Sequence, residues 1–136
     1  MKTLSTNLAD YEYENDILVV SPRSGLVLEK EDMVTMLNEA VAFTEGKKYY
    51  ALIDTSNHVE TTVEGRNYYS NSELSKYRFV DAFVVTSLPI KLVVNFYIRF
   101  NKPLIPSKMF NSRVEAMNWL LELKSRSPQQ SGIPCL

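Results

Sequence analysis

The stretch Tyr50-Ala51-Leu52-Ile53-Asp54-Thr55-Ser56 decides the predicted fold. Its first four residues are apolar or aromatic without alternation, which is typical of a strand buried on both faces. The polar run that begins at Asp54 then ends the strand. Because helix-like and strand-like segments alternate around this stretch, we predict that it is the central parallel strand of an α/β domain.

The segments before the central strand predict a hairpin and a helix. Aromatic and acidic residues alternate from Tyr11 to Glu14, Asn15-Asp16 has the form of a two-residue turn, and an apolar run follows at residues 17–20. Apolar residues then recur at helical spacing from Met33 to Thr44. A strand that leads through a helix into a parallel strand forms a βαβ unit, which is almost always right-handed.

The segments after the central strand continue the alternation. Thr61 and Glu64 have the spacing of a capping box, so we predict a helix that begins at Thr61 and fades near residues 71–72. The remaining predicted elements are a buried strand within residues 78–87, a helix over 89–100, an edge strand at 108–110 and a helix capped by Ser112. This order predicts a mixed, mainly parallel sheet that is opened by an N-terminal β-hairpin and flanked by helices.

Composition limits the class of protein. The 136 residues are 45% hydrophobic and 23% charged, as expected for one globular domain, which we place at residues 1–124. Residues 125–136 are rich in Ser, Pro, Gln and Gly and predict a mobile tail. No apolar run reaches the ~18 residues of a membrane span, and the N-terminus lacks the apolar core of a secretory signal. We therefore expect a cytoplasmic protein. The net charge of −1 and the scattered basic residues further predict that it does not bind nucleic acid.

Residue types that carry catalysis or bind metals are scarce. His58 is the only histidine and Cys135 the only cysteine, so neither a histidine-based catalytic pair nor a His/Cys metal cluster can be assembled. Acidic residues at positions 29, 31 and 32 are explained by the first turn of a helix. We therefore expect a protein that is not an enzyme and has no metal or other cofactor.

Two regions are candidate binding sites. Asp54, Ser56, Asn57 and His58 follow the central strand at the edge where open α/β sheets bind ligands, although Asp54 and Ser56 equally suit loop capping. The helix at 89–100 has polar residues on one narrow stripe, so its apolar surface is wider than the ~100° that one sheet face needs. We expect this surface either to be covered within the domain, or to contact another subunit, or to line a cavity. Its residues of interest are Val93, Phe96, Tyr97 and Phe100.

The chain resembles a known family in its layout and its final third. The Leu-Ile-Asp strand, the segments 95–103 and 106–110, and the Glu115-Ala116-Met117-Asn118-Trp119-Leu120 ending resemble bacterial STAS-like proteins over about residues 9–124. The resemblance implies a SpoIIaa-like fold. It also implies a non-enzymatic interaction or regulatory domain that is similar to anti-sigma factor antagonists.

In regulatory members of that superfamily, a phosphorylatable serine lies after an aspartate at the start of the helix that follows the central strand. The matching segment here is 59–65, and it lacks the Asp-Ser-Ser-Gly pattern. The resemblance makes Thr61 and Thr62 the candidate phospho-acceptors, with helix capping as the alternative role of Thr61.

Two functional hypotheses follow. The first is a homodimeric interaction domain whose protein-binding surface includes the 89–100 helix and the loop from Asn57 to Glu64. The second is a module that binds an apolar small molecule or lipid, as in the more distant CRAL-TRIO relatives. The second hypothesis predicts an enclosed cavity lined by Phe96, Phe100 and residues such as Phe83.

Overall fold

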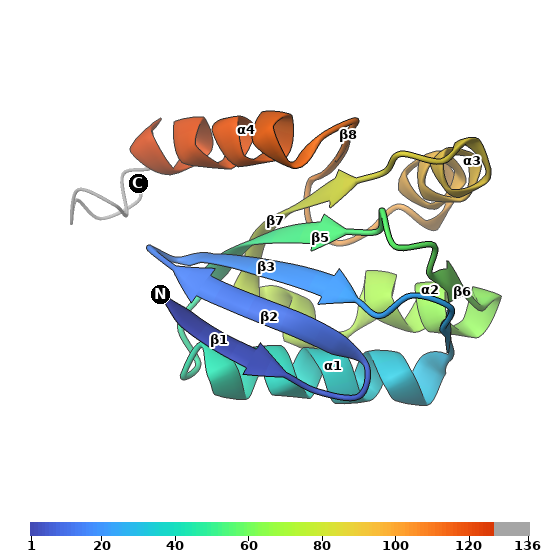
Figure 1. The fold of residues 1–136 in the computed structure, drawn as a ribbon, viewed down its shortest axis with the longest axis horizontal. Coiled ribbons are helices and arrows are strands. Elements are labelled where there is room, and N and C mark those ends of the chain that lie inside the picture. The colour runs from blue at the N-terminus through green and yellow to red at the C-terminus, as the bar shows by residue number, and fades with distance from the viewer. Residues whose placement is uncertain (127–136) are drawn as a thin grey trace.

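The computed structural model describes residues 1–126, which form a six-stranded sheet with helices on both faces (Figure 1). The strands of the main sheet are β1 (Lys2–Ser5), β2 (Ala9–Glu14), β3 (Ile17–Pro22), β5 (Tyr49–Asp54), β7 (Arg78–Val84) and β8 (Ser107–Phe110). A small parallel sheet pairs β4 (Val27–Leu28) with β6 (Glu60–Thr61). The helices are α1 (Lys30–Phe43), α2 (Val63–Asn71), the 3-10 helix η1 (Glu73–Tyr77), α3 (Leu88–Phe96), the π-helical turn η2 (Tyr97–Asn101) and α4 (Arg113–Arg126).

The sheet is mixed and mainly parallel, in the order β1-β2-β3-β5-β7-β8. The predicted hairpin is confirmed: β2 and β3 are antiparallel, and Asn15 and Asp16 have φ angles of 53° and 67°. Two consecutive positive φ angles are the signature of a type I′ turn, whose twist matches that of the flanking strands. Strand β1, which the sequence pattern did not predict, adds an antiparallel strand outside the hairpin.

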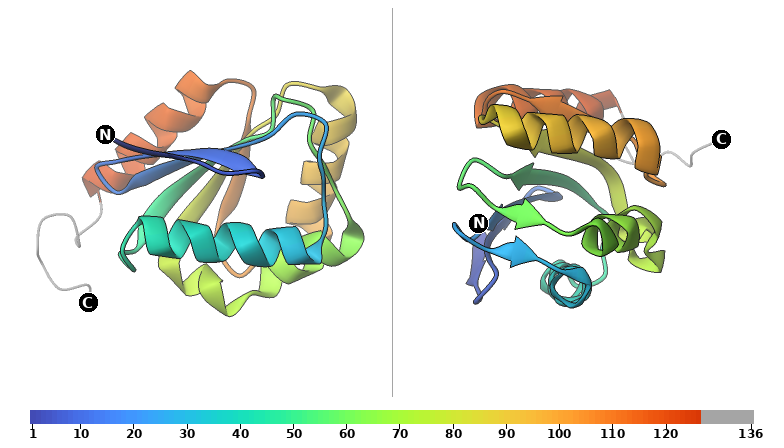
Figure 2. Two further views of the ribbon diagram at one scale, coloured as in Figure 1. Left: turned by 60° about the horizontal axis from the view of Figure 1, so that its bottom comes forward. Right: turned by 90° about the vertical axis from the view of Figure 1, so that its right-hand side faces the viewer.

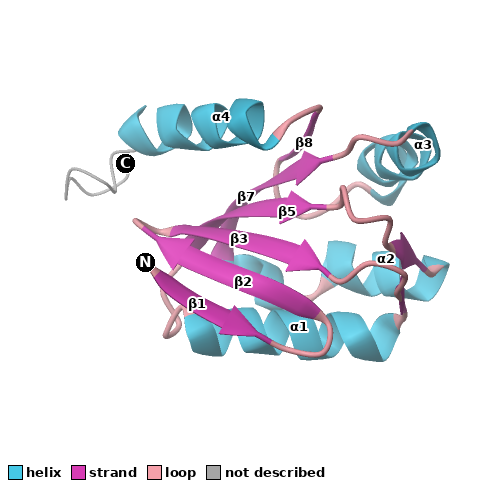
Figure 3. Ribbon diagram, in the orientation of Figure 1, coloured by secondary structure: helices cyan, strands magenta, loops and turns pink. Residues whose placement is uncertain are grey.

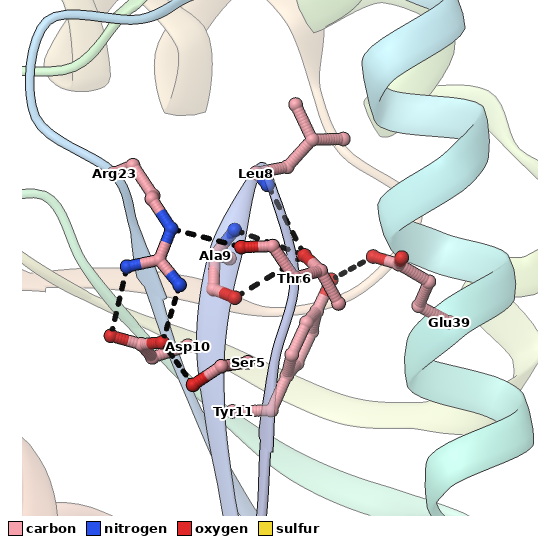
Figure 4. A network of polar contacts seen from close by, with 8 residues as sticks. All are labelled: Ser5, Thr6, Leu8, Ala9, Asp10, Tyr11, Arg23 and Glu39. Atoms are coloured by element: carbon pink, nitrogen blue, oxygen red, sulfur yellow. Dashed lines mark hydrogen bonds and ion pairs between the residues drawn. The ribbon is translucent and has the colours of Figure 1, made fainter.

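A polar network holds β1 at this edge of the sheet (Figure 4). The Arg23 guanidinium donates to both carboxylate oxygens of Asp10 and to the backbone oxygen of Thr6. The Thr6 hydroxyl oxygen accepts from the backbone N–H groups of Leu8 and Ala9. The connection between β1 and β2 is therefore fixed by side-chain hydrogen bonds as well as by the strand ladder.

Strand β5 occupies the central position that its sequence predicts. It lies between β3 and β7 and is parallel to both. Tyr50 and Leu52 pack toward α4, whereas Tyr49 and Ala51 belong to the core on the side of α1. Figure 3 shows this layered arrangement, with α1 and α2 on one face of the sheet and α4 on the other.

Three helix boundaries differ from the predictions. Thr62, not Thr61, is the N-cap of α2, because Thr61 pairs with Leu28 in the small sheet and stays extended. The predicted 89–100 helix is α-helical only to Phe96 and continues as the π turn η2. Helix α4 runs to Arg126, so the first two residues of the predicted tail are helical, and residues 127–136 lie outside the described part of the chain.

Helix α3 lies apart from the two helical layers. Figures 1 and 2 show it beyond the carboxyl ends of β5 and β7, near α2. Its Val94 and the following Tyr97 pack on Phe83 and Val85, which extend from β7. The Asn101 side chain donates to the Asn67 side chain of α2 at 2.7 Å. Helix α3 and the turn η2 thereby bridge β7 and α2 beyond the carboxyl ends of the parallel strands.

Candidate functional site

A cavity of about 530 Å³ lies between one face of the sheet and helices α1, α2 and α3. Side chains from β2, β3, β5 and β7 form its floor, and the loops that follow β5 and β7 border it. Its aromatic lining residues are Tyr11, Tyr49, Tyr69, Phe83 and Tyr97. The cavity therefore extends along the sheet from the first residues of β5 and β7 to the loops at their carboxyl ends, the edge where ligands bind in open α/β sheets.

The alternation of side chains along the strands explains the apolar lining. Residues 49, 51 and 53 of β5 share one face, and all three line the cavity. Ala51 is one of the smallest side chains there, and Ala40 brings an equally small side chain from α1. Met33 and Met36 line the same wall of α1 and can adapt to the shape of a bound molecule.

A bulge in β7 places a buried ion pair beside the cavity. Tyr49 is opposite Arg78 and Ala51 is opposite Asp81, so β7 has one more residue than β5 over this stretch. Side chains three apart in a regular strand face opposite sides, but the extra residue brings Arg78 and Asp81 to the same face. Arg78 Nε donates to Asp81 Oδ1 at 2.9 Å, and Nη2 donates to Oδ2 at 3.3 Å.

The charges of this pair balance each other in a dry environment. The two side chains are 1% and 0% exposed, and the guanidinium carbon lies 4.3 Å from the centroid of the Tyr69 ring. Burial lowers the pKa of Arg78, but the adjacent Asp81 more than compensates, so the net pKa is raised and the guanidinium stays charged. Burial raises the pKa of Asp81, and its hydrogen bonds from Arg78 act against that rise.

Two polar atoms of cavity-lining residues have no hydrogen-bond partner within the described residues. They are Nη1 of Arg78 and the hydroxyl oxygen of Tyr97, and both are buried. Burial raises the pKa of Tyr97 above its ordinary value and that of Tyr49 to about 12, so both phenols are neutral donors at neutral pH. By contrast, the Tyr11 hydroxyl donates to Glu39 Oε1 at 2.8 Å (Figure 4).

The four loop residues predicted as a binding site after the central strand do not converge on the cavity. His58 lines the cavity, where it is exposed and has a φ of 57°. Asp54 Oδ1 instead accepts from the backbone and hydroxyl of Ser56, and Oδ2 accepts from Arg113 at 2.8 Å. Asn57 is exposed and does not line the cavity. The geometry of Asp54 and Ser56 is that of loop capping and of a tie to α4.

The apolar residues of the 89–100 helix divide between two sides. Val93 and Tyr97 line the cavity, and Phe83 joins them from β7. Phe96 and Phe100 point away, are 57% and 61% exposed, and pack on each other with ring centroids 4.6 Å apart. The cavity is thus lined by Phe83 as the second hypothesis expects, but not by Phe96 or Phe100.

The two candidate phospho-acceptors have different local roles. The Thr62 hydroxyl oxygen accepts from the backbone N–H of Gly65 at 3.0 Å, which is N-capping. The Thr61 hydroxyl oxygen accepts from Arg66 Nη1 at 2.8 Å, and both residues line the cavity. Whether either threonine is phosphorylated stays a prediction.

The described part of the chain contains no cluster that could hold a metal ion and no helix that could cross a membrane. Among residues 1–126, no group of three or more His, Cys, Asp or Glu side chains is arranged to hold a metal ion. None of the helices described is both long enough and apolar enough to cross a membrane.

Comparison with known proteins places the chain in a family. Residues 11–124 match the model of a family described as a domain of unknown function, DUF7793. The chain belongs to this family. A search of curated proteins found no match.

A solved structure supports the fold assignment. The chain is similar to an uncharacterised protein of the DUF3478 family from Shewanella loihica PV-4, which has a SpoIIaa-like fold. The two share 18% identity with a TM-score of 0.57, over 86% of this chain and 98% of the other. At this identity the comparison shows the fold, and the predicted SpoIIaa-like architecture is confirmed.

The sequence interpretation missed the residues that give the cavity its polar end. Arg78 and Asp81 flank two apolar residues at the start of a buried strand, and this was the available signal. Two oppositely charged side chains in such a buried strand are tolerated only if they form an ion pair with each other. The bulge that allows the pairing left no recognisable mark in the sequence.

Proposed function

We propose that this protein is a binding module for an apolar small molecule, held in the cavity between the sheet and α1, α2 and α3. The carrying observation is the cavity itself, with a volume of about 530 Å³ and a mainly aliphatic and aromatic lining. Small-molecule sites in proteins typically enclose ~300–1,000 Å³ and combine an apolar lining with a few polar groups. The proposed role is binding without catalysis.

Packing elsewhere in the domain supports this assignment. On the opposite face of the sheet, α4 buries Ala116 and Leu120 completely against β5 and β7. Protein interiors normally leave few voids larger than a water molecule, so a space of this size needs an occupant or solvent to fill it. An apolar molecule would replace weakly bound water and gain contacts with the surrounding rings and aliphatic chains.

A fluorescent apolar probe tests the proposal. Phenylnaphthylamine fluoresces strongly in apolar surroundings, and we expect the protein to bind it at one saturable site. Ala51→Phe would fill the cavity from β5, because Ala51 is 2% exposed and lines it. We expect this variant to lose probe binding while circular dichroism confirms that it is folded.

The matched control adds the same ring elsewhere. Val114 on α4 is 69% exposed, so Val114→Phe enlarges an outer surface and leaves the cavity unchanged. Equal probe binding by the wild type and both variants would show that the probe binds outside the cavity. Together with native mass spectra free of any co-purified ligand, that result would reject the proposed function.

We propose an interaction domain, as in the STAS-like hypothesis, as a second candidate function. The observation in its favour is a row of exposed apolar side chains along α3 and the segment that follows it. They are Leu88, Leu92, Phe96, Phe100 and Leu104, each at least 57% exposed. Exposed apolar patches on soluble domains mark interaction surfaces, and the partner we expect is a second copy of this chain.

Light scattering during gel filtration tests the second candidate. A dimer that becomes monomeric in Phe96→Asp, and remains a dimer in the matched variant Leu121→Asp on α4, would support it, because Leu121 is also exposed. A wild-type monomer at high concentration would reject the homodimer. Regulation of such an interface through Thr61 or Thr62 stays a prediction.

A further inference from the structure

We infer that the ligand of this cavity is an apolar molecule with one neutral oxygen acceptor, such as a ketone, ester or amide carbonyl, held by Arg78 and Tyr97. This inference rests on the proposed function and adds the chemistry of the ligand's polar group. It follows from three features of the cavity: two donors without partners, a guanidinium whose charge is already balanced, and an otherwise apolar lining.

The unpartnered donors indicate an acceptor. Arg78 Nη1 and the Tyr97 hydroxyl are buried and have no partner within residues 1–126, and both residues line the cavity. Leaving such a group unpaired is costly, and buried polar groups in native proteins are nearly always satisfied. Both residues contact the Tyr69 ring, with the guanidinium carbon of Arg78 at 4.3 Å and the Tyr97 ring centroid at 6.3 Å from its centroid. The two donors therefore belong to one end of the cavity.

The charge balance indicates that the acceptor is neutral. Asp81 binds the Arg78 guanidinium with two hydrogen bonds and is itself fully buried. A carboxylate or phosphate ligand would bring a second negative charge next to Asp81 in a medium of low dielectric, where repulsion is strong. A carbonyl oxygen accepts from the same donors without this repulsion and loses less hydration on entering.

The lining excludes a strongly polar ligand. Apart from Arg78, the charged residues that line the cavity are Glu60, which is exposed, and Arg66. The Arg66 Nη1 group is already bonded to the backbone and side-chain oxygens of Thr61. The buried polar side-chain atoms of the lining that lack a partner within residues 1–126 are Arg78 Nη1 and the Tyr97 hydroxyl, so one acceptor atom on an apolar framework matches the site.

Three ligands with one ring system test this chemistry. Naphthalene has no acceptor, acetylnaphthalene has a ketone, and naphthoate has a carboxylate that is ionised at neutral pH. Each is titrated against the protein loaded with phenylnaphthylamine. We expect acetylnaphthalene to displace the probe at about tenfold lower concentration than naphthalene, the effect of a hydrogen bond to a charged donor. Naphthoate should require a higher concentration than acetylnaphthalene.

Two conservative variants separate the donors from the general cavity. Tyr97→Phe removes only the unpaired hydroxyl, and we expect it to reduce the advantage of acetylnaphthalene over naphthalene to about threefold. Tyr11→Phe is the matched control, since it removes a hydroxyl of the same cavity that is already bonded to Glu39. It should leave the advantage unchanged. The double variant Arg78→Met, Asp81→Leu removes the ion pair as a unit but keeps the Tyr97 hydroxyl, so it should also reduce the advantage to about threefold.

The outcomes separate the inference from the proposed function. If naphthalene and acetylnaphthalene bind equally, or if naphthoate binds most tightly, the inference is overturned while the cavity remains a binding site. If Tyr97→Phe and Tyr11→Phe reduce the preference equally, Tyr97 has no special role and the inference is overturned as well. If neither the probe nor any of the three ligands binds, the proposed function itself is rejected.

Discussion

Replacing Asp81 by leucine tests whether the buried ion pair is a structural unit of this domain. In the wild-type structure the Arg78 and Asp81 side chains are 1% and 0% exposed and are joined by two hydrogen bonds. Asp81→Leu leaves the guanidinium charged and dry, with a leucine where its counter-ion was. The Tyr69 ring, whose centroid is 4.3 Å from the guanidinium carbon, then remains as a favourable contact of its charge.

The expected loss of stability is large. Breaking a buried ion pair by removing one partner costs ~3–5 kcal/mol, and the ring contact does not offset this cost because it is already present in the wild type. We therefore expect Asp81→Leu to lower the free energy of unfolding by about 3–5 kcal/mol. Domains have total stabilities of ~5–15 kcal/mol, so this change removes a substantial share.

The double variant Arg78→Met, Asp81→Leu should behave differently. Exchanging a whole buried pair for apolar side chains of similar volume is often neutral or stabilising, so its stability should lie within about 1 kcal/mol of the wild type. The coupling between the two positions would then be ~3 kcal/mol or more in a double-mutant cycle.

Urea unfolding followed by tryptophan fluorescence measures these differences. Trp119 is the only tryptophan and packs on Phe110 on the α4 face, away from the ion pair. If the free energy of unfolding decreases by ~2 kcal/mol per M urea, the urea midpoint of Asp81→Leu should lie about 2 M below that of the wild type. Glu122→Leu is a control, because its ion pair with Arg126 is more than 60% exposed and should contribute little. A single variant within 1 kcal/mol of the wild type, or a double variant as unstable as the single one, would refute the reasoning.

Further predictions concern three local features that stabilise the fold: the hydrogen bonds of Asp54, the N-cap of α2 and the close packing at Gly65. Burial raises the pKa of Asp54, but hydrogen bonds from Ser56 and Arg113 outweigh it and hold the pKa below its ordinary value. Its contribution to stability is therefore present above the unfolded-state pKa of ~3.9 and lost as pH falls through the lower folded-state value, and Asp54→Asn should flatten acid unfolding curves. Thr62→Ala removes the α2 cap and should cost about 1 kcal/mol in urea unfolding, whereas Thr62→Ser should cost little. Gly65→Ala places a methyl group 3.0 Å from the Leu28 backbone oxygen, so its melting temperature should fall by several degrees, consistent with a cost of ~1–3 kcal/mol.

Local sequence patterns determined most of the fold. The unbroken apolar run of β5 predicted a central strand because burial on both faces removes the need for polar residues. Asn15 and Asp16 predicted a two-residue turn, and the turn is of type I′ because asparagine and aspartate tolerate positive φ angles. Met33, Met36, Leu37 and Ala40 predicted the inner face of α1 through their helical spacing, and all four are buried. In each case the residues that carry the sequence pattern lie within a few positions of the residues whose structure the pattern predicts.

Only the tertiary structure decided the features that make a site. The cap of α2 moved from Thr61 to Thr62 because Thr61 pairs with Leu28, a partner 33 positions earlier. The side of α3 that lines the cavity depends on where the helix meets β7, so Tyr97 became buried and Phe96 exposed. Arg78 and Asp81 lie on the same face of the sheet because β7 has a bulge in its pairing with β5. These features arise from contacts between distant segments, and periodicity within one segment carries no information about them.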